Sequence, residues 1–427
     1  MSDLRTQIHE LGRRARAAAR LLAQTPTDAR NRALLAMADA LLADQGAILD
    51  ANSADVAAAQ AAGLSSAMLD RLRLDEKRVR AMADGVRAVA TLPDPVGRTL
   101  REWTQPNGLK YTKVAVPIGV IGIIYESRPN VTSDSASLCL KTGNAVILRG
   151  GSESLRSNQA IAAALARGLA DAGLPGDAVQ VVASTDREAV KHLCAMDEFL
   201  DLVIPRGGRG LIEAVVASAR VPVIKHYDGI CALYVDRAAD LAMAEEIALN
   251  AKCQRPSACN AIETLLVHRE VAAALLARVG AALLARGVQL RGDAAALGIL
   301  GPLAGAQPGR VVAAKLQDYR TEFLDLVLAV KVVDSLEAAL DHIAANGSHH
   351  SDAIVTADQS AAERFLAEVD SATVYWNAST RFTDGGEFGF GAEIGISTDK
   401  LHARGPMGLE ELTTYKYVMR GTGQVRV

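Results

Sequence analysis

Between Pro117 and Ser218, short apolar runs alternate with helix-periodic segments, and this alternation limits the folds that are open to the chain. Successive strand–helix units of this length form a parallel sheet with right-handed crossovers. Gly173 and Pro175 stop the longest helical segment. The pattern predicts an α/β fold with strands at residues 119–125, 145–149, 179–182 and 202–204, and helices at 133–141, 155–171, 187–194 and 210–218.

The segments on either side extend this organisation. The first ~90 residues are helix-periodic and lack strand-like runs. Asn107-Gly108 lies between two strand-like runs, 101–105 and 109–116, and predicts a hairpin. The chain of 427 residues is long enough for two or three lobes. A second lobe is predicted from helices at 238–251 and 271–286 and strands at 261–267, 326–333, 353–355 and 373–376.

Net charge and composition limit the binding partners and the cellular compartment that we expect for the chain. The net charge of −3 gives no electrostatic reason to expect nucleic acid or a membrane surface as a partner. The longest apolar stretch, 114–125, is interrupted by Pro117 and is too short to span a bilayer. The first helix is rich in arginine but carries Asp3 and Glu10, which argue against a transit peptide. The five scattered cysteines form no C-x-x-C pair, so we expect a reducing, cytoplasmic compartment.

Two predicted strands end in glycine-rich, basic segments, residues 149–152 and 206–210. Glycines let a backbone approach a phosphate closely, and ligands of open parallel sheets bind beyond the carboxyl ends of strands. Neither segment matches G-x-G-x-x-G or the P-loop pattern, and a Gly-Gly pair after a strand is often only a turn. On these residues alone, a dinucleotide site and two ordinary turns both stay open.

The loop at residues 250–260 holds two candidate nucleophiles, Cys253 and Cys259. A thiol near Lys252 and Arg255 could have a lowered pKa and act as a nucleophile. Composition does not choose between the two cysteines, and both could be inert. G-x-S-x-G is absent, so no serine triad is inferred. The pair at 349–350 is weak as a metal site, because adjacent histidines point different ways on a strand and no carboxylate follows at ligand spacing.

Three segments resemble the gamma-glutamyl phosphate reductases (glutamate-5-semialdehyde dehydrogenases) within the aldehyde dehydrogenase superfamily. VDSLEAALDHIAANGSHHSDAI at 333–354 fits the family signature V-x5-A-x-x-H-I-x-x-x-G-S-x-H-S-D-x-I. NAKCQRPSACNAIETLLVH at 250–268 looks like the nucleophile loop, with Cys253 and Ser257 where Thr and Gly are more usual. GGEFGFGAEIGISTDKLHARGPMGLEELTTYKYV at 385–418 is characteristic as well. The resemblance covers nearly the whole chain.

The resemblance implies a Rossmann-type NADPH lobe, an α/β catalytic lobe and a β element that bridges subunits in a homo-oligomer. The exposed edges of a lone hairpin are an independent reason to expect a partner. A channelling partner, glutamate 5-kinase, is a further expectation. The implied division assigns residues 1–98 and 117–227 to the NADPH lobe, 228–400 to the catalytic lobe, and 99–116 and 410–427 to the bridging element.

The resemblance also implies a role for individual residues. Cys259 is the catalytic thiol, and Asn130 offers its side-chain amide to the developing oxyanion together with the backbone N–H of Cys259. Arg149 suits the extra phosphate of NADPH, and Glu322 aligns with the carboxylate that binds the nicotinamide ribose, although a surface carboxylate stays an alternative. The expected cofactor contacts are Arg149, Gly150, Ser152, Gly207, Gly208 and Glu322, and the expected substrate contacts are Arg128, Arg255, Arg381 and His350.

One departure from the wider superfamily bears on the mechanism. Hydrolytic aldehyde dehydrogenases use a glutamate to activate water, whereas residues 223–229 contain none and place His226 at the matching position. Without that base a thioester can be captured by hydride or phosphate, which favours NADPH-dependent reduction of L-glutamyl 5-phosphate in proline biosynthesis. The alternatives are a hydrolytic NAD-dependent dehydrogenase and a scaffold that kept the fold, and no metal is expected.

Overall fold

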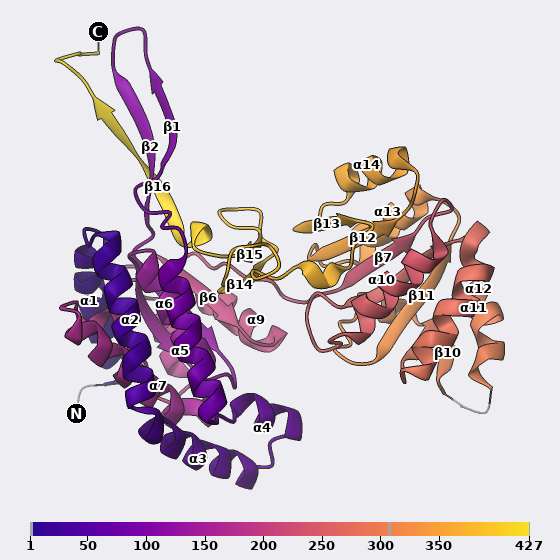
Figure 1. Ribbon diagram of the computed structural model, residues 1–427, viewed down its shortest axis with the longest axis horizontal. Helices are drawn as coiled ribbons and strands as arrows, with labels where there is room; N and C mark the ends of the chain where they lie inside the picture. Colours follow the sequence, from indigo (N-terminus) through magenta and orange to yellow (C-terminus); the bar gives the residue numbers. More distant parts are fainter. Residues whose placement is uncertain (1–2, 306–308, 427) are drawn as a thin grey trace. The chain divides into compact units, whose positions relative to one another are not determined.

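The computed structural model describes residues 3–305 and 309–426 and divides the chain into two compact units (Figure 1). Each unit has its own parallel sheet. The chain leaves unit 1 after Lys225, close to the predicted lobe boundary at 227/228. Unit 1 also takes back residues 389–395 and those from 407 onward, and unit 2 holds 226–388 and 396–406.

Unit 1 is built on a four-stranded parallel sheet with the strand order β5-β4-β3-β6. Every residue of the central strand β3 is buried, as is usual where helices pack on a parallel sheet. The strands are β3 (Val120–Tyr125), β4 (Ala145–Arg149), β5 (Val179–Val181) and β6 (Leu202–Arg206). The helices that follow them are α6 (Asn130–Lys141), η1 (Ser152–Ser154), α7 (Leu155–Asp171), η2 (Gly176–Ala178), α8 (Glu188–Cys194) and α9 (Arg209–Ser218).

Five helices precede this sheet, as the periodicity of the first ~90 residues predicts. Asp3 and Asp75 begin two of them, because each carboxylate accepts a hydrogen bond from a backbone N–H of the first turn, at 2.7 Å. Helix α2 packs against both α5 and α7. The five are α1 (Leu4–Leu22), α2 (Thr27–Ala43), α3 (Gln45–Ala61), α4 (Ser66–Leu72) and α5 (Glu76–Thr91).

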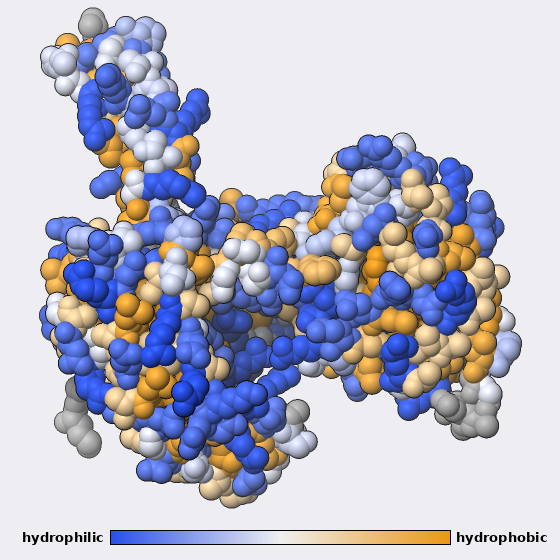
Figure 2. All heavy atoms as spheres, in the orientation of Figure 1, coloured by the Kyte–Doolittle hydropathy of each residue, from blue (hydrophilic) through white to orange (hydrophobic). Residues whose placement is uncertain are grey.

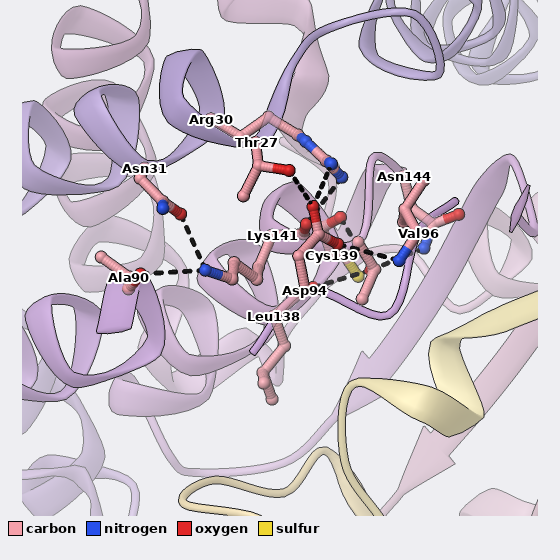
Figure 3. A network of polar contacts seen from close by, with 11 residues as sticks. Thr27, Arg30, Asn31, Ala90, Asp94, Val96, Leu138, Cys139, Lys141 and Asn144 are labelled. Carbon is pink, nitrogen blue, oxygen red and sulfur yellow. Dashed lines mark hydrogen bonds and ion pairs between the residues drawn. The ribbon is translucent and has the colours of Figure 1, made fainter. Parts of the chain in front are cut away.

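A buried polar network joins these helices to the end of α6 (Figure 3). Arg30 pairs with Asp94 at 2.5 Å, and the two side chains are only 3% and 9% exposed. Arg30 also donates to the backbone oxygen of Lys141 at 2.7 Å. The Lys141 ammonium donates to Asn31 Oδ1 at 2.7 Å and to the Ala90 oxygen at 2.9 Å. Hydrogen bonds from two buried cations, Arg30 and Lys141, therefore join α2, α5 and α6 to one another.

The predicted hairpin is present and is completed by the C-terminal strand. Strand β2 pairs on both sides in an antiparallel sheet, and Gly108 turns the hairpin with φ +84°. Tyr415, Tyr417 and Met419 are exposed on β16, and Figure 2 shows polar and apolar residues mixed along this sheet. The role of the sheet as a bridge between subunits stays a prediction. The strands are β1 (Thr99–Thr104), β2 (Lys110–Pro117) and β16 (Thr413–Arg420), the last preceded by η6 (Glu410–Leu412).

Unit 2 holds a seven-stranded sheet with the order β10-β9-β11-β8-β7-β12-β13, whose neighbouring strands run parallel. Its strands are β7 (Cys231–Val235), β8 (Ile262–His268), β9 (Gln289–Gly292), β10 (Val311–Ala313), β11 (Val327–Val333), β12 (Ser351–Val355) and β13 (Thr373–Trp376). Its helices are α10 (Leu241–Cys253), α11 (Arg269–Ala285), α12 (Ala294–Leu300), η3 (Gly301–Ala304), η4 (Leu316–Arg320), α13 (Leu336–Asn346), α14 (Gln359–Glu368) and η5 (Thr380–Phe382). Strands β14 (Gly395–Ser397) and β15 (Gly405–Met407) pair where the chain returns to unit 1.

The predicted α/β fold with parallel sheets is confirmed. Strand β7, which lies in the middle of the second sheet, was not predicted. Helix α6 begins at Asn130 rather than at residue 133, because Pro129 already has helical angles (φ −56°, ψ −32°). Among the described residues, no helix is long and apolar enough to cross a membrane.

Candidate active site

The nucleophile loop lies between the end of α10 and the start of β8, and a neighbouring segment holds it in place. The Asn260 amide donates to the backbone oxygen of Thr383 at 2.8 Å and to that of Arg381 at 3.3 Å. Thr380 Oγ1 in turn donates to the backbone oxygen of Asn260 at 2.6 Å. Asn260 is buried, so these bonds fix the loop conformation one residue after Cys259.

The structure separates the two candidate cysteines. Cys253 packs against the apolar core of unit 2, and burial raises the pKa of its thiol. Cys259 is partly exposed, and its Sγ lies within 4.8 Å of a ring nitrogen of His226 and of one of His350. Both cysteines are partly exposed, but Cys253 lies against apolar side chains, whereas Cys259 lies beside two imidazoles.

The topology of the sheet brings these three residues together. Strands β8, β7 and β12 are parallel neighbours, so the residues that precede them meet at one edge of the sheet. Cys259 precedes β8, His226 precedes β7, and His350 directly precedes β12. Gly229 permits the close approach, because a Cβ at this position would lie 1.9 Å from the backbone oxygen of Cys259.

A contact with the backbone determines which nitrogen of the His226 ring carries the proton. Its Nδ1 lies 2.9 Å from the backbone oxygen of Ile396, which can only accept a hydrogen bond. Nδ1 therefore carries the proton, and in the neutral ring the lone pair is on Nε2. A neutral His226 ring can therefore accept a proton at Nε2, and one of its two ring nitrogens lies within 4.8 Å of the Cys259 sulfur.

His350 is fully buried and has an unusual environment. Its Nδ1 lies 2.8 Å from Ser351 Oγ, and its Nε2 is buried without a hydrogen-bond partner in the described part of the chain. Burial, reinforced by nearby His226, lowers the pKa of His350 to about 3, so the ring is neutral at physiological pH. The His226 and His350 rings meet edge to face, 5.4 Å between centroids. The neighbour His349 is exposed.

Two arginines add positive charge beside this cluster. Arg381 donates from Nε to Gln254 Oε1 at 2.8 Å. Burial and the neighbouring Arg255 lower the pKa of Arg381, while the Cys259 sulfur acts in the opposite direction. Lys252, the other cation expected near the thiol, is fully buried and pairs with Glu263 at 2.6 Å. The cations available to an anionic ligand of unit 2 are therefore Arg255 and Arg381 rather than Lys252.

Glu322 contacts the segment that contains Gly229. Its Oε1 accepts a hydrogen bond from the Gly229 backbone N–H at 2.9 Å. Burial raises the pKa of Glu322, and the hydrogen bond from Gly229 partly offsets this. The carboxylate therefore lies beside the segment that carries His226, and it is not an isolated surface group.

The predicted cofactor residues other than Glu322 lie in unit 1, at the carboxyl ends of β4 and β6. Arg149 ends β4, donates to the backbone oxygens of Gly150 and Thr185 at 3.0 and 3.3 Å, and has a buried Nε without a partner among the described residues. Burial lowers the pKa of Arg149. The Gly208 N–H, at the start of α9, donates to a Glu126 carboxylate oxygen at 2.9 Å. Gly207, Gly208 and Ser152 are exposed, and Gly150 is partly buried.

The predicted oxyanion donor also lies in unit 1. Asn130 is the first residue of α6, is exposed, and donates from Nδ2 to Asp134 Oδ2 at 2.9 Å. Arg128 is exposed in the preceding turn, where Ser127 has φ +31°. Unit 1 therefore carries Asn130, Arg128 and most of the predicted cofactor residues, and unit 2 carries Cys259, His350, Arg255, Arg381 and the predicted cofactor residue Glu322. The pairing of Asn130 with Cys259 stays a prediction.

Two residues of the site, Gly229 and Asn260, were not singled out in the sequence. Gly229, Asn260 and Ser348 shape the surroundings of Cys259, and Ser348 Oγ accepts from the Ile230 N–H at 2.8 Å. Ser348 belongs to the signature segment, which was a usable signal. Gly229 and Asn260 act through backbone approach and backbone hydrogen bonds, which residue type alone does not reveal.

Comparison with known proteins identifies the relatives of the chain. The model of the aldehyde dehydrogenase family matches residues 4–327. The chain is similar to the gamma-glutamyl phosphate reductase of Paramagnetospirillum magneticum, 55% identical over 425 residues, which are 100% of this chain and 99% of that protein. It is 59% identical to that of Symbiobacterium thermophilum, over 98% of this chain and 100% of that protein.

Solved structures agree with this. The crystal structure of gamma-glutamyl phosphate reductase from Thermotoga maritima matches with a TM-score of 0.95 and 44% identity, over 98% of this chain and 100% of that one. An acetylating aldehyde dehydrogenase from Geobacillus thermoglucosidasius matches with a TM-score of 0.68 and 16% identity, over 99% and 98% of the two chains. The second likeness shows the fold alone, and it confirms the predicted aldehyde dehydrogenase-like architecture.

Proposed function

This chain belongs to the gamma-glutamyl phosphate reductases of the aldehyde dehydrogenase family, and we propose that it reduces L-glutamyl 5-phosphate with NADPH through a thioester on Cys259. The products are L-glutamate 5-semialdehyde and phosphate, in proline biosynthesis. The observation that carries the assignment of the nucleophile is the placement of the Cys259 sulfur within 4.8 Å of two imidazole nitrogens.

The first half of the reaction forms the thioester. The lone pair on His226 Nε2 takes the proton of the Cys259 thiol, while Nδ1–H stays on the Ile396 oxygen. The thiolate attacks the acyl carbon, the carbon–sulfur bond forms, and the carbon–oxygen bond to phosphate breaks. The departing phosphate takes up the proton held by His226. One displacement is thereby divided into two easier ones.

The second half releases the aldehyde. NADPH, when bound, supplies the hydride that reduces the thioester. Collapse of the thiohemiacetal oxyanion breaks the carbon–sulfur bond and returns the Cys259 thiolate, which regains a proton from solvent through His226. Asn130 and the Cys259 backbone N–H are the proposed donors to the oxyanion, and removing one such donor typically costs ~10²–10³ in rate.

Unit 1 has groups that fit a phosphorylated dinucleotide. The Gly208 N–H at the start of α9 already binds a carboxylate oxygen, that of Glu126, which supports an anion position there. Arg149 ends β4 with a buried, unpartnered Nε and has Arg187 as a second cation nearby. These charges favour the extra phosphate of NADPH over NADH. Gly150, Ser152 and Gly207 complete the proposed contacts, and Glu322 is the proposed ligand of the nicotinamide ribose.

The substrate carries a phosphate and an α-carboxylate, which require fixed cations. Arg381 and Arg255 lie beside Cys259 and are the proposed partners in unit 2, and Arg128 is the proposed partner from unit 1. His350, with its unpartnered Nε2, is the proposed neutral contact.

A hydrolytic dehydrogenase is the alternative activity. Hydrolytic aldehyde dehydrogenases use a glutamate to activate water, whereas the described group of potential ligands around Cys259 holds two histidines, of which His226 is proposed to take the thiol proton. This composition favours transfer to phosphate in the reverse direction over hydrolysis.

The compartment, the oligomeric state and the partner enzyme are also proposals. We infer a cytoplasmic homo-oligomer joined through the sheet of β1, β2 and β16, whose exposed tyrosines would be covered by a partner strand. Glutamate 5-kinase is the proposed partner that passes on the labile acyl phosphate.

The test is oxidation of glutamate 5-semialdehyde with NADP⁺, with and without phosphate. Turnover should depend on phosphate, should be lost in Cys259→Ala, and should be largely kept in the matched variant Cys253→Ala. Turnover that proceeds equally well without phosphate contradicts the reductase, and loss of turnover in Cys253→Ala alone contradicts the choice of nucleophile.

A further inference from the structure

The cluster around Cys259 has the composition of a metal site as well as that of a nucleophile. Within residues 3–305 and 309–426, His226, Cys259 and His350 are the one group of at least three His, Cys, Asp or Glu ligand atoms that lie close enough to share an ion. A thiolate with two imidazoles is a ligand set that zinc prefers, and three protein ligands leave the fourth position of a tetrahedron open.

We propose that Cys259, His226 and His350 bind one Zn²⁺ ion reversibly and that this ion inhibits the enzyme by occupying the electron pair of the nucleophile. The thiol proton passes to solvent when the sulfur coordinates. Binding of the ion concerns the protein without substrate and does not depend on the proposed reaction, whereas the inhibition rests on the proposed role of Cys259 as the nucleophile.

The spacing of the ligand atoms is close to what zinc needs. All three lie within 4.8 Å of one another. Two atoms bound to one zinc ion lie roughly 3–4 Å apart, given bonds of about 2.0–2.3 Å. Closing the cluster requires movements of about 1 Å, which small side-chain rotations supply.

The surrounding groups already orient both histidines for coordination. His226 donates Nδ1–H to the Ile396 backbone oxygen, so a neutral ring carries its lone pair on Nε2, and Nε2 is the nitrogen with which it would coordinate an ion. Metal-bound histidines in proteins commonly have such a partner on the second ring nitrogen. His350 has Ser351 Oγ 2.8 Å from Nδ1, and donation to this oxygen leaves its Nε2 lone pair available as well.

The buried, unpartnered Nε2 of His350 is the observation that points to a ligand. A polar atom that is buried without a partner costs free energy, and coordination would remove that cost. In the opposite direction, Arg381 and Arg255 place positive charge close to the sulfur. We therefore expect affinity in the micromolar range, weaker than that of four-ligand structural zinc sites.

The sequence did not predict this site, because its ligands come from three segments that precede three different strands. The pair at 349–350 was the only local signal. The structure exposes His349 and buries His350, so a single histidine of the pair faces the thiol cluster.

The experiment is calorimetric titration of the full chain with Zn²⁺, and absorption spectroscopy with Co²⁺ as a probe of sulfur ligation. The wild type should bind one Zn²⁺ per chain, give a sulfur-to-cobalt charge-transfer band, and recover full activity after chelation. Cys259→Ala and His350→Asn should weaken binding at least ~10-fold. The matched variants Cys253→Ala and His349→Asn should bind as the wild type does, and asparagine tolerates the φ of +59° at position 349.

Either of two results overturns the proposal: zinc binding that survives unchanged in Cys259→Ala, or a cobalt complex without the charge-transfer band. If His350→Asn does not fold, His226→Asn gives the same readout, since the amide can keep the hydrogen bond to Ile396. Loss of enzyme activity in any variant leaves these binding results interpretable, because no substrate is present.

Discussion

Each unit buries polar side chains, but the two groups are arranged in opposite ways. In unit 1, Arg30 meets Asp94, and the Lys141 ammonium is bonded to Asn31 and Ala90 (Figure 3). In unit 2, a fully buried His350 keeps an Nε2 without a partner beside a thiol. In unit 1 the cations bind partners from other segments and hold helices together, and within the described residues only Arg30 Nε of this group lacks a partner. The unit 2 cluster leaves bonding capacity for a substrate or an ion.

Replacing His226 should produce the largest effect, and it should be on chemistry rather than on stability. His226→Asn keeps a donor for the Ile396 oxygen but removes the proton acceptor at Nε2. We expect kcat to fall by ~10²–10⁴ with KM little changed. Steady-state kinetics and thermal unfolding of the same preparation test this. An unchanged kcat would show that His226 has no catalytic role. A loss of activity that is matched by a loss of stability would show that His226 holds the fold together, as the charged network of unit 1 does.

Replacing Asp94 should have the reverse effect. Asp94→Asn leaves the Arg30 guanidinium, 3% exposed, without its counter-charge. Breaking a buried ion pair in this way costs about 3–5 kcal/mol. Denaturant unfolding should show that loss, while kcat measured well below the unfolding transition stays close to that of the wild type. Asp84→Asn, which removes an exposed ion pair with Arg87, is the control and should change stability by less than about 1 kcal/mol.

His342 is a buried histidine of unit 2 that lies outside the Cys259 cluster, so it tests the effect of burial alone. Burial, and then the nearby Lys331, lowers the pKa of this buried histidine from 6.5 to about 4. The unfolded chain binds the proton first, so unit 2 should lose stability as the pH falls from about 6.5 to 4, by about 3 kcal/mol in total. His342→Asn should make this slope shallower in unfolding measured against pH, with the contribution of buried His350 remaining, whereas His349→Asn, at an exposed position, should keep the full slope. An unchanged slope in His342→Asn contradicts the assignment.

Replacing Arg149 tests whether unit 1 binds the 2′-phosphate of NADPH. Arg149→Met removes a partly buried cation whose Nε lacks a partner. A hydrogen bond to a charged group contributes about 1.5–3 kcal/mol, so KM for NADPH should rise at least ~10-fold while KM for NADH changes little. Equal effects on the two cofactors would move the 2′-phosphate contact to another residue.

Sequence patterns predicted helices and strands well where residues such as glycine and proline marked the end of a segment. The helix at 155–171 and the strands at 145–149 and 373–376 have the predicted bounds, and Gly173 and Pro175 explain the sharp end of that helix. Strand β7 was missed, because five apolar residues without alternation give no clear period.

The site was predictable in the same uneven way. In unit 1 the relevant residues follow β4 and β6 and are contiguous in sequence, so the glycine-rich segments were visible. In unit 2 the cluster lies at the amino ends of β7, β8 and β12, where the rule about carboxyl ends gives no guidance. Residue types left Cys253 and Cys259 equivalent, the family resemblance chose Cys259, and the packing of Cys253 against the unit 2 core supports that choice.

The most direct test of the account is to trap the thioester. The enzyme is mixed with glutamate 5-semialdehyde and NADP⁺ without phosphate, quenched in acid and digested, and the fragment ions of the 253–260 segment are read by mass spectrometry. A glutamyl adduct on Cys259 that disappears when phosphate is added is the predicted result. An adduct on Cys253, or phosphate-dependent turnover with no adduct at either cysteine, would contradict it.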